Sequence, residues 1–214
     1  MTQGLRYFVI SSNATSKNQA YSLRTSMTIY RVRVSLLDIE PPIWRRIELS
    51  GQTTLRQFHR ILQIVMGWEN SHLHEFLVGL QRYGVPDPTY DEPGDVVPEG
   101  KVRLSEVLPT PGAQIRYQYD FGDCWQHAVE LESVIEAVEG IEYPRLVDGA
   151  RSCPPEDSGG VSGYVDLLDI LTDPQHEEFE HMRAWAGDKF NAEVFSMKAI
   201  NLRLRKNRSL ASRG

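Results

Sequence analysis

The chain has 214 residues, of which 41% are hydrophobic and 24% are charged, a composition ordinary for a globular protein with one sizeable core. No apolar run approaches the ~20 residues of a membrane helix, and the patch that follows Tyr7 is too short for a secretory signal. Cys124 and Cys153 are the only cysteines. We therefore expect a cytoplasmic protein with no disulfide framework and no membrane partner.

The charge is unevenly distributed along the chain. The net charge is −6, but residues 130–180 carry 14 acidic and two basic side chains, and residues 181–214 carry eight basic and two acidic ones. The acidic block argues against a broad phosphate-binding face and favours protein partners. The basic end could contact nucleic acid, or it could simply neutralise the acidic block.

The first third of the chain predicts an extension, two strands and a helix. Residues 1–26 are polar and show no period, which predicts a flexible N-terminal extension and leaves Met27 open as the start of translation. Apolar residues alternate over 28–40 and again over 43–50, the pattern of two neighbouring strands. Apolar spacing over 53–68 predicts a helix that a threonine caps and Gly67 ends.

The middle of the chain returns to strands. Alternation over 72–79 predicts a third strand, and four prolines and three glycines make 84–100 a long loop. A short helical turn is expected over 102–108. The segments 113–120 and 124–137 read as two strands that flank a turn containing Phe-Gly-Asp.

The last third predicts an irregular stretch followed by helices. Residues 143–164 are rich in proline and glycine, 165–172 and 174–187 read as helices, and 195–207 as a helix or a strand with a tail. The expected fold class is α+β: a small mixed or antiparallel sheet, a helix packed after the first two strands, and a mostly helical C-terminal part. The expected domain spans 27–206, followed by a basic disordered tail over 207–214.

Five motifs occur together in a familiar order. They are PPIWRRIEL, TLRQFHRILQIVMGWENSHLHEF, YQYDFGDCWQHAVELE, YP…GARSCPPEDSGGVSGY and WAGDKFNAEVFSMKAIN. In this order and spacing the chain resembles the plasmid pRiA4b ORF-3-like family over about residues 28–206. Members are also labelled insertion-element passenger proteins, and sometimes TnpR.

The resemblance implies a single α+β domain carried on plasmids and transposons, with no assigned activity. A resolvase role is not carried over, because the chain shows no nucleophilic serine with an arginine cluster and a DNA-binding tail. Many members have cysteines at two places where this chain has Leu146 and Ser158. A multi-thiol metal site is therefore not expected.

Polar side chains in three segments form the candidate binding pocket. One group lies on a strand, one around the Phe-Gly-Asp turn and one in the proline-glycine loop, where rigid and permissive residues can hold polar groups in place. The candidate residues are His72, His74, Asp120, Asp123, Trp125, His127, Arg151, Cys153, Glu156 and Asp157. If a divalent metal binds, the expected ligands are Asp123, His127, Glu156 and Asp157.

Each of these residues also has a structural interpretation. The histidines can line a packed strand, Trp125 can belong to the core, and Cys153 can act as a small buried hydrophobe. Asp120 can accept N–H groups of its own turn. Glu156 and Asp157 can cap the next helix or bind Arg151.

Two function classes follow from the sequence. The first is a binding or accessory module of a mobile genetic element that acts through protein contacts. The second is a metal-dependent hydrolase or nuclease that uses a carboxylate and histidine pocket. No motif such as C-x-x-C, H-E-x-x-H or a phosphate-binding loop decides between them.

Overall fold

A computed structural model describes residues 27–207 of the chain. The expected N-terminal extension, and the expected tail beyond its first residue, lie outside these residues. In the described part of the chain, no helix has the length and apolar character to cross a membrane.

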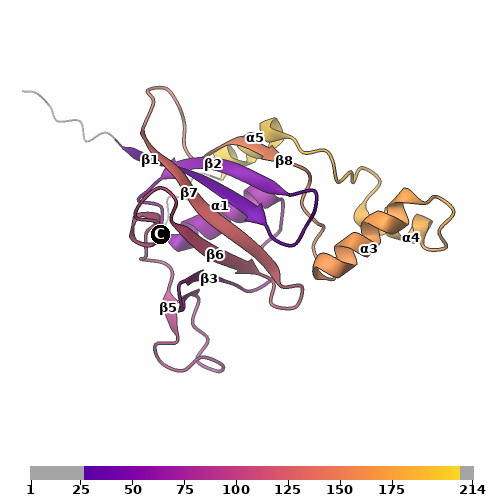
Figure 1. The fold of residues 1–214 in the computed structure, drawn as a ribbon, viewed down its shortest axis with the longest axis horizontal. Coiled ribbons are helices and arrows are strands. Elements are labelled where there is room, and N and C mark those ends of the chain that lie inside the picture. Colours follow the sequence, from indigo (N-terminus) through magenta and orange to yellow (C-terminus); the bar gives the residue numbers. More distant parts are fainter. Residues whose placement is uncertain (1–26, 208–214) are drawn as a thin grey trace, which may run out of the picture.

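Across residues 27–207, the fold is organised by one mixed sheet of eight strands (Figure 1). The strands are β1 (Thr28–Leu36), β2 (Trp44–Ser50), β3 (His74–Val78), β4 (Gln81–Gly84), β5 (Val96–Pro98), β6 (Gln114–Tyr119), β7 (Trp125–Glu136) and β8 (Arg145–Ala150). Their order in space is β5-β4-β3-β6-β7-β1-β2-β8. Neighbours are antiparallel, except that β4 and β5 run parallel.

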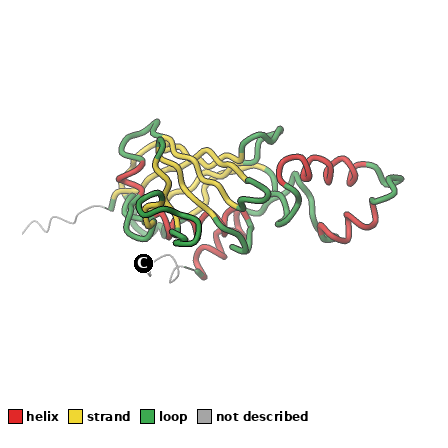
Figure 2. The backbone as a smooth tube through the Cα atoms, turned by 90° about the horizontal axis from the view of Figure 1, so that it is seen from below, coloured by secondary structure: helices red, strands yellow, loops and turns green. Residues whose placement is uncertain are grey.

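Within the described residues, five helices accompany the sheet. They are α1 (Leu55–Met66), α2 (Leu104–Val107), α3 (Gly160–Thr172), α4 (Phe179–Ala186) and α5 (Met197–Lys206). Seen along the sheet in Figure 2, the helices that pack on it lie on one side. The hairpin of α3 and α4 instead projects from the body as an arm.

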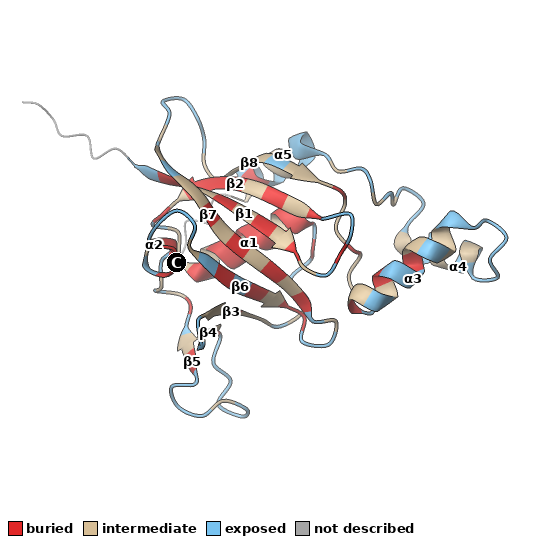
Figure 3. Cartoon of the chain, viewed as in Figure 1, coloured by how far each residue is buried: buried red, intermediate tan, exposed pale blue. Residues whose placement is uncertain are grey.

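Helix α1 is fixed by its ends and by its apolar face. The hydroxyl of Thr54 accepts the N–H of Gln57, whose side chain in turn accepts the N–H of Thr54, and Gly67 ends the helix in the left-handed conformation. Its buried residues, among them Phe58 and Leu62, pack on the sheet face that carries Val32 and Tyr117. Figure 3 shows that buried and less buried positions alternate along the central strands of the sheet. The helix predicted from periodicity is confirmed.

The predicted fold class is wrong in the size of the sheet and in the C-terminal part. Eight strands, not a small set, form the sheet, and the segment expected to be irregular contains β8. Strand β8 includes Asp148 and Gly149, which disfavour strands. It forms because the free edge of β2 supplies hydrogen bonds, and because the Asn201 side chain on α5 bonds the backbone N–H and C=O of Leu146. Strands β4 and β5 were missed for the same reason, since pairing partners rather than local alternation specify them.

Candidate functional site

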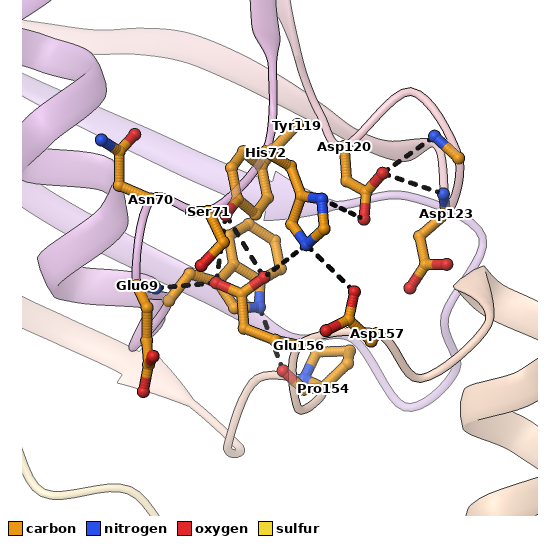
Figure 4. Close-up of polar contacts among 12 residues, drawn as sticks. Glu69, Asn70, Ser71, His72, Tyr119, Asp120, Asp123, Pro154, Glu156 and Asp157 are labelled. Carbon is orange, nitrogen blue, oxygen red and sulfur yellow. Dashed lines mark hydrogen bonds and ion pairs between the residues drawn. The ribbon is translucent and has the colours of Figure 1, made fainter.

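The structure brings four of the predicted residues into one cluster, which we call the His72 cluster: His72, Asp120, Glu156 and Asp157 (Figure 4). His72 precedes β3, Asp120 directly follows β6, and the two other carboxylates come from the proline-glycine loop. Segments about 50 and 35 residues apart in the sequence therefore meet at one imidazole.

The imidazole of His72 is approached on both of its nitrogens. Its Nδ1 lies 3.5 Å from Asp120 Oδ2, and its Nε2 lies 3.0 Å from Asp157 Oδ1 and 3.6 Å from Glu156 Oε2. The Nε2 atom is shielded from solvent, yet neither oxygen is placed to form a well-directed hydrogen bond with it. Coordinating atoms of His72, Asp120 and Asp157 all lie within 4.8 Å of one another.

Each carboxylate of the cluster is held by a separate set of contacts. Oδ1 of Asp120 accepts the backbone N–H of Gly122 at 2.8 Å, so the predicted turn role of Asp120 is confirmed while its second oxygen faces His72. Glu156 accepts the N–H of Glu69 at 2.7 Å and the hydroxyl of Tyr119 at 3.1 Å. Oε2 of Glu156, which lies 3.2 Å from the same Tyr119 hydroxyl, is 3.6 Å from Nε2 of His72.

The loop that carries Glu156 and Asp157 is docked on the turn and on the core. The indole N–H of Trp68 donates to the carbonyl of Pro154 at 3.1 Å, and Asp123 Oδ2 accepts the N–H of Gly159 at 3.1 Å. A Cβ on Gly160 would lie 2.5 Å from the backbone oxygen of Asp123, so only glycine permits this approach. Asp123 therefore positions the loop and does not face His72.

The electrostatics of the His72 cluster are unbalanced. Side-chain exposure is 28% for His72, 10% for Asp120, 19% for Glu156 and 70% for Asp157. Among the residues that the structure describes, no lysine or arginine forms an ion pair with these carboxylates. The imidazole of His72 can neutralise at most one of the three carboxylate charges. Because the cluster is partly buried, the repulsion among the remaining negative charges is costly. Burial, together with the charge of Glu156, raises the pKa of the Tyr119 phenol well above its usual range, so this hydroxyl stays a donor.

The predicted His127 does not join the cluster. Its ring is fully buried, with Nδ1 3.2 Å from the carbonyl oxygen of Tyr117 and with the ring of Trp68 edge-on. Burial lowers the pKa of His127 to about 4, so the ring is neutral at pH 7. The structure therefore does not bring the expected ligands together, namely Asp123, His127, Glu156 and Asp157. Alternation along a strand predicts which residues share a face, but it does not decide which of the two faces is turned to the core. Trp125 is a core residue.

His74 belongs to a second polar layer. Its ring stacks on His59 with centroids 3.4 Å apart, and its Nε2 lies 2.9 Å from Glu99 Oε2. Burial opposes ionisation of Glu99, but the hydrogen bond from His74 and the charges of the neighbouring basic side chains together outweigh it and hold the pKa of the carboxyl below its usual range. Burial lowers the pKa of His59 to about 4. His72 and His74 therefore serve different contacts.

Arg151 and Cys153 anchor the loop on the far side of the cluster. Arg151 donates to Glu193 and to the carbonyl of Pro41, not to Glu156 or Asp157. The Cys153 thiol lies 3.3 Å from the guanidinium of Arg45, and burial raises its pKa to about 11. Cys153 is thus an unreactive packing residue.

Sequence reasoning missed the residues that support the cluster, namely Trp68, Glu69 and Tyr119. A signal for Tyr119 was available, because Ile115, Tyr117 and Tyr119 alternate onto the face that packs on the core. Two tyrosine hydroxyls on a core face indicate buried polar partners. No comparable signal marks Glu69, which contributes only its backbone N–H.

Comparison with known proteins supports one family. The model of the family described as plasmid pRiA4b ORF-3-like protein matches residues 28–199. An uncharacterized protein, y4hQ of Sinorhizobium fredii, is 37% identical over 160 residues, which cover 75% of this chain and 81% of that protein. The crystal structure of a protein of unknown function, MM3350 from Methanosarcina mazei, is similar with a TM-score of 0.73 and 39% identity, covering 81% of this chain and 98% of the other.

Proposed function

This chain belongs to the plasmid pRiA4b ORF-3-like protein family, and we propose that it is a binding module whose His72 cluster holds one divalent metal ion. The observation that carries the proposal is the shielded Nε2 of His72, which faces two carboxylate oxygens without a directed hydrogen bond. An ion between them would offset the surplus negative charge.

The three carboxylates divide into two roles around the metal. Asp120 contacts Nδ1, the arrangement in which a carboxylate orients an imidazole and presents the other nitrogen to a metal. Nε2 of His72, Oε2 of Glu156 and Oδ1 of Asp157 then supply one nitrogen and two oxygens. This mixed set suits Zn²⁺ or Mn²⁺ better than Mg²⁺ or Ca²⁺, which prefer oxygen ligands alone.

A metal at this position would connect parts of the fold that are distant in sequence. His72 leads into β3, whereas Glu156 and Asp157 lie just before α3. Occupancy would therefore fasten the start of the α3–α4 arm to the sheet. We place this module in the cytoplasm on the basis of its two free cysteines. Its family, named after a plasmid reading frame, supports an accessory role in a mobile genetic element.

The test is metal content after loading. Protein purified in EDTA is dialysed against Zn²⁺ or Mn²⁺ and analysed by mass spectrometry. About one equivalent is expected for the wild type, and the loss of bound metal is expected for His72→Ala and for Glu156→Gln. The Gln side chain keeps the acceptor for the N–H of Glu69. His181→Ala removes an exposed histidine of α4 and serves as the matched control.

Two results would contradict the proposal. One is a wild type that retains no metal after loading. The other is equal metal content in the wild type and in His72→Ala, which would assign the ion elsewhere. His127→Ala tests the ligand set expected from sequence, and we predict that it keeps the metal.

A second candidate function is metal-dependent hydrolysis, which one observation favours. His72 also lines a cavity of about 530 Å³ whose wall includes Arg82, Tyr90 and Phe121. A substrate held there would lie beside the imidazole. Metal-loaded wild type assayed on a phosphodiester and on an ester substrate, with His72→Ala as the control, distinguishes catalysis from binding alone.

A further inference from the structure

The α3–α4 arm carries a concentrated negative charge. Residues 160–186, from the start of α3 to the end of α4, contain six acidic side chains against a single basic one, Arg183. The arm projects from the body in both views (Figures 1 and 2). All of its acidic side chains are exposed.

A groove between α3 and α4 gives this acidic arm an apolar floor. The groove has a volume of about 450 Å³. Its apolar floor and acidic rim are formed by Leu167, Ile170, Met182, Trp185, Asp166 and Glu178. Trp185 is 45% exposed, whereas tryptophan side chains are highly buried on average. The floor would accept one aliphatic side chain, and the rim would accept cations beside it.

Helix α5 of the same chain has the complementary surface. It contains Lys198, Arg203, Arg205 and Lys206 and no acidic residue. Lys198, Leu202 and Arg205 lie at positions i, i+4 and i+7 and so share one face. Leu202 is 51% exposed, whereas Leu204 is buried toward the body. On α5, an exposed leucine thus lies between two cations. In the groove, correspondingly, an apolar floor lies between carboxylates.

Helix α5 packs on the body of its own chain. It packs against β8 and α1, where Asn201 bonds the backbone of Leu146. In Figure 1 it lies beside β8 at one edge of the sheet, separate from the arm. Arg205 forms an ion pair with Glu142 at 3.5 Å but keeps 63% of its side chain exposed, and Lys198 is exposed as well. The basic face and the acidic groove of one molecule are therefore both accessible at once.

We propose that the α3–α4 groove binds the exposed face of α5 from a second copy of this chain. Leu202 would enter the groove, and Lys198 and Arg205 would face Asp166 and Glu178. When each copy offers both surfaces, two reciprocal contacts close a two-fold dimer. The contact is rich in exposed charge, so it is weakened by salt.

The experiment measures association of the full chain by sedimentation velocity over a concentration series in EDTA. A dimer is expected in about 50 mM salt, with at least a tenfold weaker association in about 500 mM salt. Leu202→Asp alters the helix face, and the double variant Asp166→Lys/Glu178→Lys alters the groove. Each is expected to weaken association at least tenfold. Leu80→Asp changes a fully exposed leucine of the β3–β4 turn and is the matched control.

Mixing the two variants identifies the interface. The groove variant retains an intact α5, and the Leu202→Asp variant retains an intact groove, so their equimolar mixture should form a heterodimer more tightly than either variant associates alone. Circular dichroism confirms that each variant is folded.

Three results would overturn the proposal: a wild type that stays monomeric at about 0.5 mM in low salt, a dimer that both variants leave unchanged, or a mixture that fails to associate. The assay is run in EDTA, and the substituted residues lie outside the His72 cluster. Its outcome is therefore independent of whether the cluster binds metal.

Discussion

Replacing Asp157 by asparagine should change stability in opposite directions with and without metal. Asp157 has a φ of 58°, a left-handed conformation that asparagine tolerates well, so the substitution removes a charge while preserving backbone and volume. In EDTA the variant loses one repulsive carboxylate. In Zn²⁺ it loses one ligand.

The magnitude without metal follows from the separation of the charges. Oxygens of Asp120 and Asp157 lie within 4.8 Å of each other. Two unit charges at that distance repel by roughly 1 kcal/mol in water and by about 3.5 kcal/mol at an effective dielectric constant of 20. Because Asp157 is 70% exposed, the lower figure applies. Asp157→Asn should therefore be about 1 kcal/mol more stable than the wild type in EDTA.

The magnitude with metal follows from mass action. Zn²⁺ at about one hundred times its dissociation constant adds about 2.7 kcal/mol to the free energy of unfolding of the wild type. A tenfold loss of affinity in Asp157→Asn would remove about 1.4 kcal/mol of that gain.

Urea denaturation at about pH 8, where imidazoles are largely uncharged, measures all four free energies. A variant that is less stable than the wild type in EDTA, or one that gains as much from Zn²⁺ as the wild type does, would refute the reasoning.

Three further predictions concern the loop, the core and the thiols. Gly160→Ala should lower the free energy of unfolding by about 2 kcal/mol, because its Cβ meets the turn carbonyl, whereas Gly187→Ala has an open Cβ position and should cost less in the same urea assay. His127, with its pKa lowered to about 4 by burial, stays unprotonated in the folded chain while the unfolded chain takes up a proton near pH 6.5. Stability should thus fall from pH 6.5 to 4 by up to about 1.4 kcal/mol per pH unit from this residue, and His127→Gln should reduce that slope. A thiol reagent should modify exposed Cys124 quickly and Cys153 only on unfolding; two fast thiols would contradict the packing role of Cys153.

The sequence determined the parts of the fold that local patterns encode. The periodicity of Leu55, Phe58 and Leu62 and the capping by Thr54 specify α1 without reference to the sheet. Alternation likewise specified β1, β2, β6 and β7, since each has one face against the core. The pattern of neighbouring residues encodes these features, although packing of the apolar face on the core supplies most of their stability.

The tertiary structure alone decided the edges of the sheet and the composition of the candidate site. Strand β8 exists because β2 offers an unpaired edge, and the sequence of β8 gives no comparable local signal. The sequence pointed to His127, and not to His72, as a metal ligand, yet His72 meets three carboxylates and His127 is enclosed by the core. The physical reason is that convergence of side chains depends on how distant segments dock, and here Gly160 and Trp68 fix that docking through contacts that no local spacing encodes.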